Sequence, residues 1–200
     1  MSHRLYHTSA FVLRHLPRGE ANKLLYLLTP EFGRCLVLAR GVRQEKSKLR
    51  PNLVDYGYGR FSLVRGREFW RLVSAEKDSR FAQLYVNPAR RAVIGRIFSL
   101  LAKILSEEED SQLIFQELEA LCQSLTSLTP DTNLIEATEQ LFLLRLVKHL
   151  GYWPEGTGLG ELVETKTWSP DLLKKLTEPK LRLEAVRTIN HFFHEHNWLV

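Results

Sequence analysis

The fold is decided by three short apolar runs: Ala10-Phe11-Val12-Leu13, Lys23-Leu24-Leu25-Tyr26-Leu27-Leu28 and Arg34-Cys35-Leu36-Val37-Leu38. Turn signals separate them, Pro-Arg-Gly at 17–19 and Thr-Pro-Glu-Phe-Gly at 29–33. Short apolar runs bounded by Gly- and Pro-containing turns are typical of β-strands. We therefore predict three strands ahead of the first long connection.

Two further strands are predicted at 60–64 and 69–73, joined by a connection of hairpin length, Arg65-Gly66-Arg67. Five short strands in about 75 residues fit a small closed barrel better than a sandwich, and an OB-fold has that number of strands. We predict an OB-fold over residues 1–80.

The rest of the chain predicts helices, with apolar residues at helical spacing. Pro88 suits the first turn of one helix, and the acidic run 107–110 suits the start of the next. The segment 134–150 is apolar on most sides, as in a helix at the centre of a bundle, and Gly151 suits its end. Residues 154–169 are predicted to be irregular, before a last helix at 183–198. The predicted class is α+β, with an all-α helical domain at 81–200.

Charge divides the chain in the same way. Up to Tyr85 there are 16 Lys and Arg against 7 Asp and Glu, whereas from Val86 onward there are 12 against 16. Such asymmetry indicates a nucleic-acid-facing module and a second module with another task. The two cysteines, Cys35 and Cys122, are interpreted as small buried residues. With no membrane span or signal peptide predicted, we expect a cytoplasmic, nucleoid-associated protein.

A basic stretch directly follows the third predicted strand, with five cations against one acid between Arg40 and Arg50. Such a loop suits a phosphate backbone, although from charge alone a solvated loop is an equal alternative. Further arginines on the predicted hairpin alternate with aromatic residues, a combination used to bind single strands. Taken one at a time, Phe61, Phe69 and Trp70 are better explained as core residues.

Other motifs favour no chemistry. The histidines at 191, 194 and 196 lack the order of a metalloprotease site, and a solvated helix face explains them better than a metal. The glycine-rich segment 156–160 lacks the end of a phosphate loop and is interpreted as a connector. No spacing marks a catalytic set, so we predict no enzyme, no cofactor, no metal and no small-molecule substrate.

Several positions together resemble the recombination mediator family RecO, over roughly residues 5–155. They are Ala10-Phe11-Val12-Leu13, Glu20, Thr29, Gly33, Gly41, Arg43, Lys46-Ser47-Lys48-Leu49, Leu53, Ser74-Ala75-Glu76 and Leu150-Gly151-Tyr152. Many RecO proteins carry a zinc module with two cysteine pairs after the last segment. Here 153–158 contains no cysteine, so the zinc module is expected to be absent. The chain is also short at its C-terminus for this family.

The resemblance implies an OB-fold followed by a helical domain. It implies binding to single- and double-stranded DNA, annealing of complementary strands, and action with RecR as single-strand-binding protein is replaced by the recombinase RecA. The resemblance also implies that Arg43, Lys46 and Lys48 contact DNA. On grounds of charge we add further candidates: Arg40, Arg50, Arg65, Arg67 and Arg71.

The leading hypothesis is therefore a DNA-binding recombination mediator that anneals single strands and assists recombinase loading in DNA repair. Two alternatives stay open. One is an OB-fold protein that binds RNA. The other is a non-enzymatic protein-interaction adaptor, in which the acidic helical half binds the partner and the basic stretch contributes little.

Overall fold

The computed structural model describes residues 4–109, 111–129, 131–154 and 156–198. The chain forms two compact units. The barrel unit runs to Ala82 and takes in Phe98–Phe115, and the helical unit holds Gln83–Ile97 and the residues from Gln116 onward. The domain boundary between residues 80 and 81 stays a prediction.

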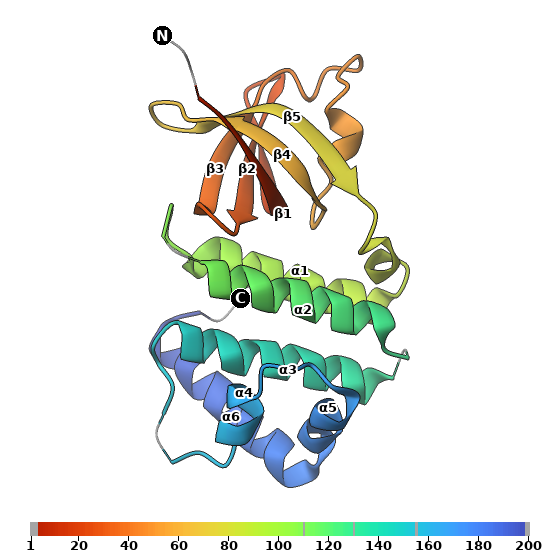
Figure 1. Ribbon diagram of the computed structural model, residues 1–200, viewed down its shortest axis with the longest axis vertical. Helices are drawn as coiled ribbons and strands as arrows, with labels where there is room; N and C mark the ends of the chain where they lie inside the picture. Colours follow the sequence, from red (N-terminus) through yellow and green to blue (C-terminus); the bar gives the residue numbers. More distant parts are fainter. Residues whose placement is uncertain (1–3, 110, 130, 155, 199–200) are drawn as a thin grey trace. The chain divides into compact units, whose positions relative to one another are not determined.

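Five strands close into a barrel in the order β1-β2-β3-β5-β4 (Figure 1). They are β1 (Leu5–Arg18), β2 (Asn22–Thr29), β3 (Gly33–Ala39), β4 (Tyr58–Val64) and β5 (Trp70–Asp78). Neighbouring strands are antiparallel except β3 and β5, which run parallel. A five-stranded barrel of this kind is an OB-fold, and the predicted fold class is confirmed.

Strand β1 is longer than predicted because it pairs with two partners. Its first half runs beside β4, from Leu5 opposite Val64 to Phe11 opposite Tyr58, and its second half runs beside β2. The register shifts between Val12 and Arg14, which marks an irregularity of the kind that bends a strand. One bent strand thus closes the barrel.

Alternate residues of the strands fill the barrel. On β3, Cys35, Val37 and Ala39 are buried, whereas the residues between them are partly exposed. Phe61 and Trp70 also belong to this core, as predicted. Both cysteines are free and buried, which confirms their interpretation as small core residues.

Phe11 is buried on the opposite face of β1. Its ring centroid lies 4.7–6.0 Å from the rings of Tyr58, Phe81, Phe98 and Phe115. Phe98 and Phe115 come from α1 (Pro88–Ile104) and α2 (Gln112–Ser127), in the parts of those helices that belong to the barrel unit. Because both faces of β1 are covered here, its apolar run is continuous rather than alternating.

Helix α3 (Thr132–His149) packs in the helical unit against α4 (Gly160–Glu164), α5 (Pro170–Thr177) and α6 (Pro179–Glu195) (Figure 1). Leucines of these helices form the core. The predicted helix stop is confirmed: Gly151 has φ 82°, and the Tyr152 N–H donates to the Val147 carbonyl at 3.0 Å.

One α3 side chain in this interior is charged. Arg145 is 1% exposed and pairs with Glu117 at 3.0 Å. It also donates to the carbonyls of Thr165 and Thr167, and its guanidinium lies 5.0 Å from the centroid of the Trp168 ring. These contacts fix the segment after α4 to α3.

Three predictions for the helical part are wrong. The acids from Glu107 do not open α2, which starts at Gln112; Asp110 lies outside the described residues. The segment 154–169 holds the short helix α4, and the last helix begins at Pro179. Helix α5 was not predicted, although its start carries a signal: the Ser169 hydroxyl accepts from the Leu172 N–H at 3.2 Å and Pro170 follows it.

None of the helices in the described residues is both long enough and apolar enough to cross a membrane.

Candidate nucleic-acid interface

An arginine-lined pocket of about 450 Å³ lies where three segments of the barrel meet. We call it the arginine pocket. Arg18 ends β1, Arg40 directly follows β3, and Arg67 belongs to the connection between β4 and β5. Parallel pairing of β3 with β5 places Leu38 opposite Arg71. The full lining is Arg18, Leu38, Arg40, Gly66, Arg67, Glu68, Phe69 and Arg71.

The pocket combines cations with an aromatic ring. The Arg18 guanidinium lies 4.5 Å from the centroid of the Phe69 ring, at cation–π distance. Phe69 is half-buried, so it lies in the pocket rather than in the core that the sequence favours for it. Gly66 lets the hairpin close tightly, because a Cβ at this position would clash with the Phe69 carbonyl.

The electrostatics of the pocket favour an anion. Four guanidinium groups line it, against the single carboxylate of Glu68. Among the described residues, none of these four arginines lies within ion-pair distance of a carboxylate. In an OB-fold, the loops between strands 1 and 2 and between strands 4 and 5 are the ones that bind oligonucleotides. Arg18 and Arg67 lie at those two places.

The basic stretch after β3 is held down by apolar anchors. Val42 is fully buried in the barrel core, Leu53 is 2% exposed, and Leu49 packs against the same core. Successive tight turns connect them, with backbone bonds such as Ser47 N–H to the Gln44 carbonyl at 3.1 Å. The cations between these anchors are exposed: Arg43, Lys46, Lys48 and Arg50.

Arg43 connects this stretch to the β1–β2 turn. Its backbone N–H donates to the Ala21 carbonyl at 3.0 Å, and its Nη1 donates to the Gly19 carbonyl at 2.8 Å. The Gly41 N–H donates to Asn22 Oδ1 at 2.9 Å. The start of the basic stretch therefore lies beside the turn that carries Arg18.

The structure separates the predicted contacts into three groups. Arg40, Arg67 and Arg71 line the arginine pocket. The exposed cations of the basic stretch, Arg43, Lys46, Lys48 and Arg50, lie outside its lining. Arg65 pairs with the Glu108 carboxylate and lies 5.6 Å from the Trp70 ring centroid, so a protein carboxylate already compensates its charge.

Sequence reasoning missed Arg18. The segment Pro17-Arg18-Gly19 signals a turn, and that signal hides the charge in its middle. The place of this turn between the first two barrel strands was the signal that could have identified it.

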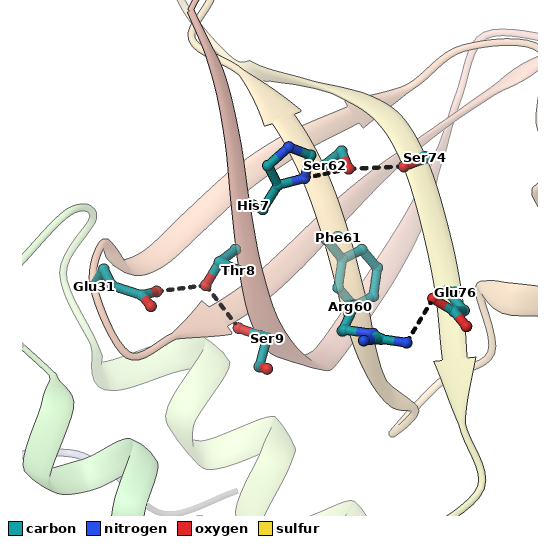
Figure 2. Close-up of a pocket in the computed structure, with 9 residues that line it drawn as sticks. All are labelled: His7, Thr8, Ser9, Glu31, Arg60, Phe61, Ser62, Ser74 and Glu76. Atoms are coloured by element: carbon teal, nitrogen blue, oxygen red, sulfur yellow. Dashed lines mark hydrogen bonds and ion pairs between the residues drawn. The ribbon is translucent and has the colours of Figure 1, made fainter.

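A second pocket lies over β1, β4 and β5, with a volume of about 580 Å³ (Figure 2). Ser74 donates to Ser62 at 2.8 Å, and Ser62 shares a hydrogen bond of 2.9 Å with His7 Nδ1. Arg60 pairs with Glu76 at 3.0 Å, and Glu31 adds a second carboxylate. With two acids against one guanidinium, this pocket suits a polyanion less well than the arginine pocket.

Nothing in the described residues marks a metal site or a reactive thiol. No group of three His, Cys, Asp or Glu side chains is placed there to hold a metal ion. Burial, with a further contribution from the Glu108 charge, raises the pKa of Cys35 to about 12. This thiol is therefore neutral at physiological pH, and thiolates are the reactive form.

Comparison with known proteins finds one family. Residues 1–79 match the family model "Recombination protein O N terminal". The chain is 32% identical over 152 residues to a DNA repair protein RecO from Heliobacterium modesticaldum, covering 76% of this chain and 54% of that protein. For the protein of the same name from Dehalococcoides mccartyi it is 29% identical over 150 residues, covering 75% and 58%. The chain thus spans little more than half the length of these relatives.

Proposed function

We propose that this chain, whose first 79 residues belong to the RecO N-terminal family, acts in DNA repair by binding the phosphate backbone of DNA. The observation that carries the proposal is the arginine pocket. It gathers four guanidinium groups and an aromatic ring, and two of the four arginines, Arg18 and Arg67, lie at the two OB-fold loops that bind oligonucleotides. The exposed cations of the basic stretch extend the same chemistry.

The finer role proposed is annealing of complementary single strands. Lys and Arg side chains neutralise phosphates on both strands and so lower their mutual repulsion. Since those contacts go to the backbone, the base edges stay free to pair. No covalent bond changes in this process, so the proposed role is non-enzymatic.

The proposed partners follow from the family. They are single- and double-stranded DNA, RecR and single-strand-binding protein, and the wider role is assistance in recombinase loading. We place the protein in the cytoplasm at the nucleoid, and we assign DNA binding to residues 1–80 and partner contacts to residues 81–200.

The direct test is annealing of complementary oligonucleotides coated with single-strand-binding protein. The wild-type chain is expected to accelerate annealing, and the triple variant Arg43→Ala/Lys46→Ala/Lys48→Ala is expected to lose most of that effect. A matched control is Lys166→Ala/Lys180→Ala/Arg187→Ala, which removes the same charge from exposed positions of the helical unit. Equal loss in both variants would contradict a specific role for the basic stretch.

Two further outcomes separate the alternatives. In a competition assay, DNA is expected to displace a bound single-stranded DNA probe more effectively than RNA of the same sequence, and the reverse order would favour an RNA-binding protein. If this triple variant and Arg40→Ala/Arg67→Ala/Arg71→Ala both bind DNA as the wild type does, a protein-interaction adaptor is favoured instead.

A further inference from the structure

A short acidic segment between α1 and α2 lies against the start of β3. We call residues 107–109 the acidic strap; all three are glutamates. The strap runs parallel to the start of β3, with Glu107 bridging to Arg34 and the Glu108 N–H donating to the Arg34 carbonyl at 3.1 Å. Arg34 Nε also donates to the Leu105 carbonyl at 2.6 Å. The strap is therefore held by main-chain bonds and not by charge alone.

The position of the barrel that the strap contacts requires a glycine. Gly33, in the turn between β2 and β3, has φ +60°, and a Cβ at this position would clash with the Glu109 carbonyl. The barrel backbone and the strap backbone therefore approach more closely than any other residue type would permit.

Glu108 has the most unusual conformation in the strap. Its φ is 58°, in the left-handed region that residues other than glycine seldom adopt. Both carboxylate oxygens are used: Oε1 accepts from the Trp70 indole N–H at 2.9 Å, and Oε2 pairs with Arg65. A disfavoured backbone persists where surrounding contacts determine it, and such residues cluster at switch regions and ligand clamps.

The residue that Glu108 engages lies next to the arginine pocket. Arg65 directly precedes Gly66 of the pocket lining, and Trp70 directly follows Phe69. A carboxylate on a guanidinium uses the same charge-assisted hydrogen bonds as a phosphate. Glu108 thus occupies the place that a backbone phosphate would take on Arg65, whereas the four pocket arginines stay available.

From this arrangement we propose that the acidic strap is an internal competitor for nucleic acid. Glu108 masks Arg65 in the free protein, and a phosphate that reaches Arg65 must displace it. The inference rests on the proposed function, because it concerns the regulation of the same binding surface. The Glu108–Arg65 pair lowers the affinity of the barrel for nucleic acid below the value that its cations would otherwise give. Bound strands therefore stay exchangeable.

The test is Glu108→Gln, with Glu107→Gln as the matched control. The amide oxygen of Gln can still accept from Trp70, so the variant removes the negative charge that faces Arg65 and little else. Glu107→Gln removes the same charge one residue away, but its partner Arg34 is only 12% exposed. Binding of a fluorescent thymidine oligonucleotide is measured by anisotropy over a series of salt concentrations.

Glu108→Gln is expected to bind about two- to fivefold more tightly, the range that an exposed ion pair is worth. Its plot of log K against log salt should steepen by about 0.7, because one more cation exchanges counterions for phosphate. Glu107→Gln should match the wild type. An unchanged Glu108→Gln, or an equal gain in both variants, overturns the inference.

A second comparison removes the partner of Glu108. If Glu108 masks Arg65, Arg65→Ala costs little affinity in the wild-type background, whereas Arg67→Ala costs more. In the double variant Arg65→Ala/Glu108→Gln the gain should disappear, since the freed side chain is missing. Equal losses for Arg65→Ala and Arg67→Ala overturn the masking. If the wild type itself shows no salt-dependent binding, the proposed function fails first.

Discussion

The Arg18 guanidinium lies 4.5 Å from the centroid of the Phe69 ring, although the two residues are far apart in the sequence. Arg18 is the last residue of β1, and Phe69 directly precedes β5. This contact joins the β1–β2 turn to the β4–β5 hairpin. It also gives the arginine pocket the two features that single-strand binding uses, a cation and an aromatic ring.

Phe69→Ala should therefore weaken binding of single strands more than binding of duplex. Loss of one base-stacking ring costs about 1–3 kcal/mol on a single strand, whereas paired bases are not available for stacking. Anisotropy titrations with the single strand and with its duplex measure the difference. Phe69→Trp, which keeps a stacking surface, is the control. Equal losses on both substrates would show that Phe69 acts only through the shape of the hairpin.

The lysines of the basic stretch should act through charge alone. Lys46→Ala/Lys48→Ala is expected to weaken binding of all DNA sequences to a similar extent. It should also make the salt slope for single strands shallower by about 1.4, since each lost phosphate contact contributes about 0.7. Lys166→Ala/Lys180→Ala, which removes two exposed lysines of the helical unit, should leave the slope unchanged. A sequence-dependent loss would contradict backbone binding.

Arg145 should be among the most destabilising positions of the helical unit to truncate. Arg145→Ala leaves the carbonyls of Thr165 and Thr167 and the Glu117 carboxylate without their donor. Breaking a buried pair in this way costs about 3–5 kcal/mol in the free energy of unfolding. Urea unfolding measures it, with the exposed Arg187→Ala expected within about 0.5 kcal/mol of the wild type. A small effect for both would mean that water replaces Arg145 without penalty.

Glu117 should make the stability of the helical unit depend on acid. Burial opposes its ionisation, but hydrogen bonds from His149, Arg145 and Trp168 and the charge of Arg145 outweigh burial and lower the pKa of Glu117. Because the folded-state pKa lies below the unfolded value of about 4.3, the ionised group stabilises the fold above that pH. The contribution is lost as the pH falls through the folded-state pKa.

Urea unfolding of Glu117→Gln from pH 7 to pH 3 tests this. The variant should be less stable than the wild type at pH 7, and the two should approach each other at the acid end. Glu164→Gln, whose carboxylate is 70% exposed, is the control and should change little at any pH. A constant difference between Glu117→Gln and wild type would mean that ionisation of Glu117 contributes nothing.

Much of the barrel could be predicted because its information is local. The apolar runs at 10–13, 23–28 and 34–38 identify three strands, and the hairpin at 65–67 joins the last two. The length of β1 could not be predicted, because its ends have no apolar pattern of their own. They become strand only through pairing with β4 on one side and β2 on the other.

The candidate site was less predictable because distant segments build it. Arg65 and Arg67 are equivalent in the sequence, but in the structure Arg65 pairs with Glu108, 43 residues away, whereas Arg67 lines the arginine pocket. Arg18 gains its role from Phe69, which no local pattern connects to it. Buried Arg145 could not be identified either, since carbonyls from the segment after α4 are what compensate it.

The most direct test of the central claim is the salt dependence of single-strand binding by the wild type and by Arg40→Ala/Arg67→Ala/Arg71→Ala. With four pocket cations engaged, the wild-type slope of log K against log salt should be about −3 or steeper. The triple variant should be shallower by about 2, because three phosphate contacts are lost. A flat wild-type plot, or an unchanged slope in the variant, would contradict DNA binding through the arginine pocket.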